Sequence, residues 1–185
     1  MASIDNIMSI LDLQFTGLDG GCQQILFKVD GDTFGIDVLN IQELIRYTAP
    51  VKVPKSPDFV TGVINFRGEI IPVLDLRKIF SKNEVICDDF TVISVVETEG
   101  KIFGLLVDRV TDIITLSNEQ IQPIPEFANN LKTQYLKSIG KMGEQLVLML
   151  DLNRLVDFEK IEESVNRFLE INQKKSIKKQ SKKQG

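Results

Sequence analysis

The feature that most constrains the fold is an order of strand-like segments that occurs twice along the chain. FGIDVLNIQELI at 34–45 resembles FGLLVDRVTDII at 103–114, and IPVLDLRKIF at 71–80 resembles VLMLDLNRLV at 147–156. The members of these pairs begin 69 and 76 residues apart and keep the same order. Self-similarity at a nearly constant spacing indicates a duplicated unit. The sequence therefore predicts a mainly β chain that forms two similar small barrels packed side by side.

Turn signals divide this β-rich sequence into hairpins. Asp30-Gly31 separates two strand-like runs and is a dipeptide typical of tight hairpin turns. Residues 59–75 predict two further strands that divide at Gly68. We expect structural turns at Gly31, Gly62 and Gly68, where a residue without a Cβ atom tolerates conformations that others avoid.

Shorter segments lie between the strands. The apolar spacing of Leu39–Tyr47 is compatible either with one or two helical turns or with an irregular strand. Leu76–Phe80 is predicted to form a helical turn, and Ser117–Gln120 has the spacing of a capping box at the start of another.

Longer helices are expected at the ends of the chain. Ile161, Val165 and Phe168 would share one helical face, and a similar apolar spacing occurs near the N-terminus. The predicted units are an N-terminal extension that is partly helical (1–21), a first barrel (22–86), a second barrel (87–158), a C-terminal helix (159–173) and a disordered lysine-rich tail (174–185).

The charge is unevenly distributed. The chain has 26 acidic and 22 basic residues, a net charge of −4, but residues 174–185 hold six lysines and no acid, so residues 1–173 alone carry −10. An acidic body repels phosphate backbones and argues against nucleic acid as a partner. The apolar runs are far shorter than the roughly 20 residues of a membrane span, and the start lacks the basic region of a secretory signal. We therefore expect a cytoplasmic protein.

The side chains offer little for catalysis. There is no histidine, which removes the commonest general base and metal ligand. Asp30, Asp32 and Gly35 imitate a calcium loop, but Phe34 and Ile41 stand where ligand oxygens are required. No glycine-rich phosphate loop is present, and the chain has no tryptophan for stacking on sugars. We expect no enzymatic activity, no metal and no cofactor.

The two cysteines, Cys22 and Cys87, are too few and too far apart for a metal clip or a redox motif. In a reducing compartment they are expected to be plain thiols.

The run GVINFRGEIIPVLDLR at 62–77 carries a resemblance to a known family. Together with FGIDVLNIQEL and VPKSPDFV before it and GLLVDRVTDI after it, this run resembles the CheW family of bacterial chemotaxis coupling proteins, over about residues 22–158. The resemblance implies two five-stranded SH3-like barrels and an adaptor without catalytic activity. Such adaptors connect the cytoplasmic tips of transmembrane chemoreceptors to the histidine kinase CheA, and they meet the membrane only through the receptors.

The resemblance also implies how the barrels share strands. In the family the first strand belongs to both barrels, so Cys22–Gln24 would join the second barrel and Ile25–Val29 the first.

The resemblance further implies a receptor-binding groove between the barrels. The family's receptor-binding positions correspond here to Ile41, Glu43, Arg67, Gly104, Val110 and Ile113. If the strand alternates up to Gly68, Val63, Asn65 and Arg67 point away from Ile64 and Phe66 and toward that groove. Two alternatives stay open: Arg67 and Glu43 pair across the barrels and only hold the groove's shape, or Ile41 belongs to the core.

The kinase-binding positions implied by the resemblance lie in the first barrel, at Val51, Lys52, Phe59 and Val60. Alternative interpretations are an isolated CheW-like regulatory domain of a histidine kinase, a CheV-type protein, or, outside the family, a small-barrel nucleic-acid-binding module.

Overall fold

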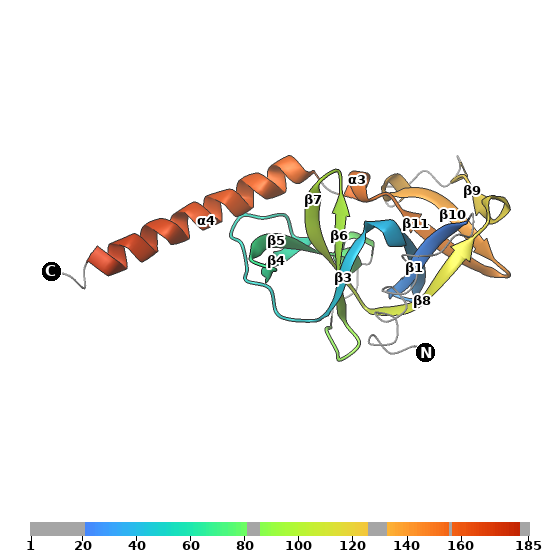
Figure 1. Ribbon diagram of the computed structural model, residues 1–185, viewed down its shortest axis with the longest axis horizontal. Helices are drawn as coiled ribbons and strands as arrows, with labels where there is room; N and C mark the ends of the chain where they lie inside the picture. The colour runs from blue at the N-terminus through green and yellow to red at the C-terminus, as the bar shows by residue number, and fades with distance from the viewer. Residues whose placement is uncertain (1–20, 81–85, 126–132, 156, 182–185) are drawn as a thin grey trace.

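The computed structural model describes residues 21–80, 86–125, 133–155 and 157–181. The predicted N-terminal helix lies outside these residues. The described residues form two β-sheets, short helical turns and a long C-terminal helix (Figure 1), which confirms the predicted mainly β fold. The elements follow in the order β1 (Cys22–Val29), β2 (Asp32–Asp37), η1 (Val38–Asn40), β3 (Ile41–Arg46), β4 (Val60–Phe66), β5 (Glu69–Asp75), α2 (Leu76–Phe80), β6 (Val92–Thr98), β7 (Lys101–Val107), β8 (Arg109–Leu116), η2 (Asn118–Gln120), β9 (Ile121–Gln122), η4 (Thr133–Tyr135), β10 (Leu136–Met142), β11 (Gln145–Leu150), α3 (Leu152–Leu155) and α4 (Phe158–Ser181).

Most of the local predictions hold, but the turn expected at Gly62 is wrong, because Gly62 lies within β4, at a shift in its register with β5. Asp30-Gly31 forms the turn of the β1–β2 hairpin, and the strands predicted over residues 59–75 are β4 and β5. The ambiguous Leu39–Tyr47 segment is a short 3₁₀ turn followed by β3, whose pairing with β6 shifts register between Ile41 and Glu43, so the irregular-strand interpretation is the correct one.

Each sheet combines a hairpin from one half of the chain with strands from the other half. The strand order is β3-β6-β7-β5-β4 in the five-stranded sheet and β8-β1-β2-β11-β10-β9 in the six-stranded sheet, where β9 has only two residues. Hairpin β1–β2 pairs with β8 on one side and, in parallel, with β11 on the other. Hairpin β6–β7 pairs in the same way with β3 and, in parallel, with β5. The two halves have therefore exchanged their hairpins.

This exchange corrects two expectations. The division at residue 86 does not separate the sheets, because β1 and β2 belong with β8–β11 whereas β6 and β7 belong with β3–β5. Strand β1 is not divided between the sheets either: it pairs with β8 from Cys22 to Lys28, within the six-stranded sheet. The physical reason is that turn signals specify which neighbouring strands form a hairpin but not which distant strand receives that hairpin.

Three apolar clusters follow from this arrangement. The largest lies between the sheets and draws on both of them, including Phe27 and Phe34 from one and Phe103 and Leu105 from the other. A second cluster fills the five-stranded sheet's own interior, and a third fills that of the six-stranded sheet. Strands such as β1 and β7 are therefore buried on both faces, which explains their nearly continuous apolar sequence.

Aromatic rings connect the parts of the inter-sheet cluster. The ring centroids of Phe27 and Phe34 are 6.1 Å apart, and Phe34 lies 4.6 Å from Phe80 of α2. Phe80 in turn meets Tyr135 edge-on at 6.0 Å. Each ring of this size removes roughly 150–250 Å² from water, so this row contributes strongly to holding the two sheets together.

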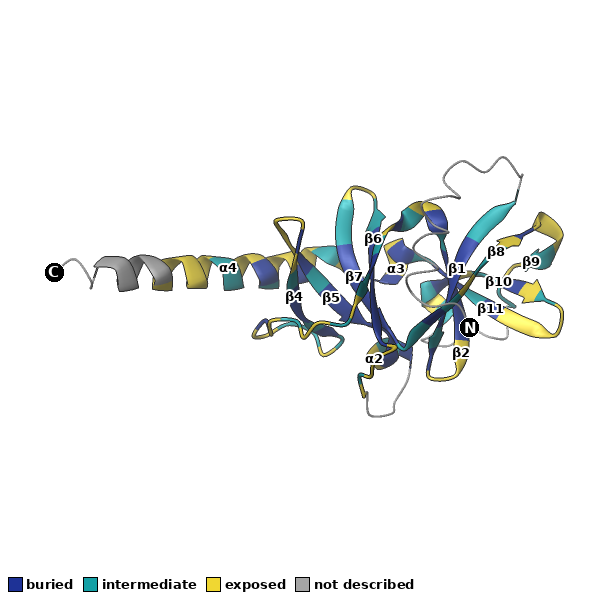
Figure 2. Ribbon diagram, turned by 60° about the horizontal axis from the view of Figure 1, so that its bottom comes forward, coloured by how far each residue is buried: buried dark blue, intermediate teal, exposed yellow. Residues whose placement is uncertain are grey.

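Helix α4 packs on the five-stranded sheet only through its first turns. Ile161 and Val165 are buried in the inter-sheet cluster, and Phe158 meets Phe103 of β7 edge-on at 5.0 Å. The helix then continues to Ser181 and points away from both sheets (Figures 1 and 2), beyond the predicted end at residue 173. The prediction of a disordered tail is wrong over 174–181, because Lys, Gln, Ser and Ile support a helix where no Pro or Gly interrupts it.

A buried ion pair fixes the junction between the sheets. Arg77 of α2 and Asp75 of β5 are both buried, and Nε and Nη2 of Arg77 donate to the two Asp75 carboxylate oxygens at 2.9 and 3.1 Å. Arg77 Nη1 also donates to the Ile86 carbonyl at 3.1 Å and lies 3.4 Å from Asp108, which accepts the backbone N–H of Asp30 in the β1–β2 turn. Burial opposes the charged form, but the hydrogen bonds and charge of Asp75 outweigh it and raise the pKa of Arg77. The chain of contacts from Asp75 through Arg77 and Asp108 to the β1–β2 turn thus links the two sheets.

We predict that Arg77→Met lowers the free energy of unfolding by about 3–5 kcal/mol, because it leaves the Asp75 carboxylate buried and unpaired. The double variant Asp75→Leu/Arg77→Met should lose markedly less, since it removes both charges at once. Urea unfolding followed by circular dichroism measures both. Equal losses in the single and double variants would contradict the assigned role.

Candidate protein-binding surfaces

Arg67 lies in a hairpin turn whose shape is set by Asn65, two residues before it. Arg67 and Gly68 both have positive φ values, +51° and +91°, and connect β4 to β5. The side-chain Oδ1 of Asn65 accepts the backbone N–H of Gly68 at 3.0 Å, which closes the turn from one side. The amide at position 65 therefore has a structural role: it stabilises the backbone that presents Arg67.

Arg67 forms an ion pair with Glu43 at the surface. Arg67 Nη2 lies 2.8 Å from Glu43 Oε2, and the guanidinium carbon lies 4.9 Å above the Phe66 ring. The side chains remain 66% and 33% exposed, so the pair contributes at most about 1 kcal/mol to folding. Glu43 is on β3 and Arg67 follows β4, the two edge strands of the five-stranded sheet. The pair connects these edges within one sheet and does not cross between the sheets.

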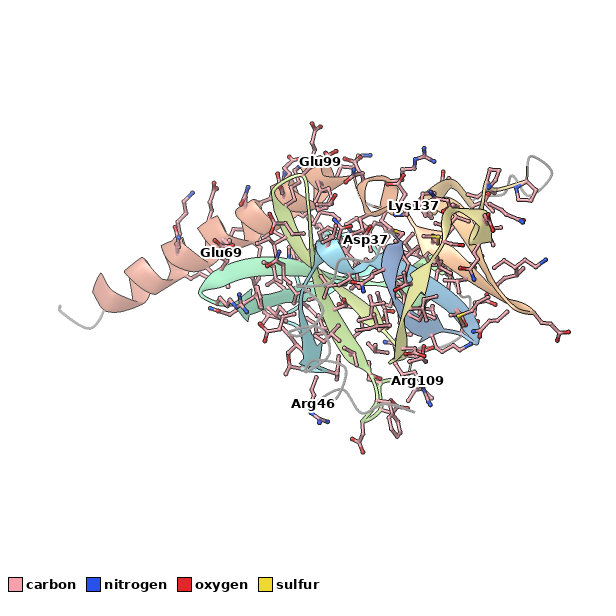
Figure 3. All side chains as sticks on the ribbon, turned by 45° about the vertical axis from the view of Figure 1, so that its right-hand side comes forward. Asp37, Arg46, Glu69, Glu99, Arg109 and Lys137 are labelled. Atoms are coloured by element: carbon pink, nitrogen blue, oxygen red, sulfur yellow. The ribbon has the colours of Figure 1, made fainter. Side chains whose placement is uncertain are left out.

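The interior between the two sheets is packed with apolar side chains. The inter-sheet cluster includes Val63, so this side chain faces the core and not a surface groove. Arg67 does not continue the strand's alternation because it is in the turn, and the β4–β5 hairpin tip, next to the labelled Glu69, points away from the sheet that carries Lys137 (Figure 3). Arg67 is thus exposed at the hairpin end of the five-stranded sheet.

The remaining predicted receptor-binding residues are mostly interior. Ile41 and Val110 are 4% and 7% exposed and belong to the inter-sheet cluster, so for Ile41 the structure favours the core alternative. Gly104 is buried on β7, where an added Cβ would lie 2.7 Å from Ile93 Cγ2. Ile113 is half-buried against the inter-sheet cluster and keeps an accessible edge.

The predicted kinase-binding segment is partly exposed. Val51 is 60% exposed and Lys52 is exposed, Phe59 is half-buried against the inter-sheet cluster, and Val60 is buried in it. Val51 pairs with Val63 of β4 through two backbone hydrogen bonds of 2.9 Å, although the rest of its segment forms no regular strand. This pairing fixes Val51 on the outer edge of the five-stranded sheet.

Gly62 permits that pairing. A Cβ atom at Gly62, whose φ is +150°, would lie 2.3 Å from the Val51 carbonyl oxygen. No side chain fits there without displacing the Val51 segment. At Gly68 the φ is also positive, but an added Cβ would meet nothing within 4 Å.

Two hollows flank the predicted kinase-binding segment. A hollow of about 390 Å³ includes Lys52 and Val60 in its lining. A second, of about 730 Å³, is lined by Phe59 together with Tyr135, Leu155 and Ile161 among others, so α4 supplies part of its wall. Sequence reasoning missed this second hollow. The helical spacing that includes Ile161 predicted a packed helix face but not the surface against which it packs.

The two cysteines do not form a disulfide, and the surroundings of Cys22 disfavour its thiolate form. Cys22 is on β1 and Cys87 precedes β6, and both are free. Burial, followed by the charge of Asp37, raises the pKa of Cys22. Among the described residues no group of His, Cys, Asp and Glu side chains could hold a metal ion. Within the same part of the chain, no helix has the length and apolar character needed to cross a membrane.

We predict that Gly68→Ala lowers the free energy of unfolding by about 1 kcal/mol, through its backbone conformation alone. Gly62→Ala should cost at least about 2 kcal/mol more, because it also disrupts the Val51–Val63 pairing. Thermal and urea unfolding measure both variants, and Gly68→Ala is the matched control for positive φ. Similar losses in both would show that the close approach at Gly62 is unimportant.

Comparisons with known proteins agree with this geometry. The model of the CheW-like domain family matches residues 23–160. The chemotaxis protein CheW of Klebsiella aerogenes is 37% identical over 141 residues, which are 76% of this chain and 85% of that protein. A probable chemotaxis protein CheW of Rhizobium etli is 31% identical over 136 residues, 74% of this chain and 88% of that protein.

A solved structure shows the same fold. The crystal structure of the scaffolding protein TtCheW from Thermoanaerobacter tengcongensis superposes with a TM-score of 0.67 at 29% identity, and the match covers 71% of this chain and 90% of that one. The family match extends over most of the chain and includes both sheets. The chain therefore belongs to the CheW-like domain family.

Proposed function

We propose that this protein is a chemotaxis adaptor that couples the cytoplasmic tips of transmembrane chemoreceptors to the histidine kinase CheA. Family membership and the likeness to a scaffolding protein support a role in protein–protein interaction. An adaptor needs two separate binding surfaces and no catalytic group, and the sequence offers no histidine. The protein would act in the cytoplasm and reach the membrane through the receptors, within a receptor–kinase array.

The receptor-binding surface would be centred on Arg67 and Glu43. Arg67 is exposed, its backbone is held by the Asn65 turn and its guanidinium lies over the Phe66 ring, so the side chain is presented outward to a partner. Preorganised arginines are frequent among residues that dominate interface energetics. Ile41 and Gly104, on β3 and β7, would act from the interior by shaping the sheet that carries this surface. Ile113, on β8 of the other sheet, would add apolar contact to a partner that spans both sheets, and Val110 would support Ile113 from the interior.

The kinase-binding surface would be centred on Val51 and Lys52. An exposed valine on a fixed strand edge is suited to packing against another small barrel, and Phe59 lines the adjoining hollow. Val60 would support this surface from the core.

Both surfaces adjoin β4. Val63, which pairs with Val51, precedes Phe66, the last residue of β4, by three residues, or roughly 10 Å along the strand, and Arg67 follows in the turn. That separation allows one substitution to disturb one surface only. The observation that carries the proposal is the exposed Arg67 guanidinium on a turn preformed by Asn65.

We predict that Arg67→Glu weakens binding to receptor tips by about 30-fold or more while leaving CheA binding unchanged, because it reverses the charge at the centre of the receptor surface. The matched control is Arg167→Glu on α4: Arg167 is 60% exposed and pairs with Glu163 at 2.9 Å, much as Arg67 pairs with Glu43. Co-sedimentation with receptor fragments and pull-down of CheA measure the two affinities. Unchanged receptor binding by Arg67→Glu would refute the assigned surface.

We predict the opposite selectivity for Val51→Asp, which should weaken CheA binding and spare the receptor. Val51 is a better probe than Phe59, since Phe59 packs on the core and its loss would disturb folding. Leu146→Asp is the control, because Leu146 is 55% exposed on the other sheet. Loss of both partners in either surface variant, with folding intact, would contradict the idea of two separate surfaces.

A further inference from the structure

The packing of α4 on the sheets fades along the helix. Among the residues of α4 whose burial the structure describes, which end at Lys175, Phe168 and Leu169 are the last half-buried ones, and Ile171–Lys175 are all exposed. The helix nevertheless continues to Ser181, pointing away from the sheets (Figures 1 and 2). The eleven residues from 171 to 181 span about 16 Å at the helical rise. The family match ends at residue 160, so this arm is an addition to the shared domain.

The arm carries a regular basic pattern. Lysine pairs occur every four residues, at 174/175, 178/179 and 182/183, and no acidic residue follows Glu170. The first two pairs are within α4. At 3.6 residues per turn, a spacing of four shifts the second pair by only about 40° around the axis from the first, so the two pairs within α4 occupy positions on one side of the helix. The arm therefore has a one-sided row of positive positions.

The lysines of this row repel one another. Like charges four residues apart destabilise a helix by about 0.2–0.5 kcal/mol for each pair, and Glu170, four residues before Lys174, is the last acidic residue at that spacing. Lys178 and Lys179 lie roughly 11 Å along the axis beyond Ile171, more than the Debye length of about 8 Å at physiological ionic strength, so the acidic body neutralises them little. The same separation screens the body's repulsion from an anionic partner. The arm is thus suited to an external surface of negative charge.

We propose that the projecting end of α4 docks on an anionic lipid bilayer. A one-sided row of lysines matches a flat surface of uniform charge, and lysine clusters on a helix are typical of binding to anionic lipid headgroups. Nucleic acid is a poorer match, because residues 171–185 contain neither arginine nor an aromatic residue to read or stack on bases. The contact is electrostatic and peripheral, and it does not depend on the proposed adaptor function.

The test is flotation of the full-length protein with vesicles of phosphatidylcholine alone or with about one third phosphatidylserine. We expect binding to the anionic vesicles only, with strong weakening when salt is raised, because screening shortens the reach of each charge. Lys174→Glu/Lys175→Glu should reduce the partition coefficient by about 25-fold or more, the factor expected from roughly 1 kcal/mol for each lysine.

Two controls isolate the arm. Lys137→Glu/Lys141→Glu makes the same change in net charge at exposed positions of β10 and should keep most of the binding. Lys174→Arg/Lys175→Arg keeps the charge and should bind as the wild type does. Thermal unfolding of each variant confirms that the fold is intact.

The proposal is overturned by any of three results: equal binding to neutral and anionic vesicles, no binding to either, or an equal loss in the β10 control. It is also overturned if a DNA duplex of equal charge concentration displaces the protein from the vesicles. A further contrary outcome is that sedimentation shows the protein associating with itself in a salt-sensitive way while it does not bind vesicles. That result would mean that the arm binds the acidic body of a second copy.

Discussion

The fold depends on the apolar cluster packed between the two sheets. Neither sheet is complete without the hairpin it takes from the other half of the chain, so the cluster joins two units that cannot separate without losing strand pairs. The Arg77–Asp75 pair adds a polar connection at the same junction, and α4 attaches to the cluster through Ile161 and Val165. The centres of both proposed binding surfaces, at Arg67 and at Val51, are at the edge of the five-stranded sheet, and their geometry therefore depends on packing that involves the whole domain.

Much of the fold could be predicted from local sequence patterns. Asp30-Gly31 and the strands on either side of Gly68 have the expected structure, and the repeated order of segments corresponds to a repeated strand order in the sheets. The exchange of hairpins could not be predicted, because β1 and β6 are apolar on both faces and either could pair with β3 or β8 without violating a local rule. The end of α4 was missed for another reason: low hydrophobicity was interpreted as disorder, although nothing in its sequence interrupts a helix.

In the candidate site, too, some residues could be placed from the sequence and others could not. The charged positions Arg67 and Glu43 form a pair at 2.8 Å, as one alternative had it, but within one sheet and not across the barrels. The apolar positions Ile41 and Val110 are in the core, because sequence identifies an apolar strand residue but not which of two buried faces it occupies. The roles of Asn65 and Gly62 became clear only from tertiary geometry, where one closes a turn and the other admits a neighbouring carbonyl.

The most direct test of this account is native-state hydrogen exchange in low concentrations of urea. If the exchanged hairpins and the shared cluster make the two sheets one cooperative unit, the amides of the β1–β2 and β6–β7 hairpins should exchange through the same opening, with equal free energies and equal urea dependence. Exchange of β1–β2 at a free energy lower by more than about 2 kcal/mol, with β6–β7 still protected, would show that the sheets open independently and would contradict the account.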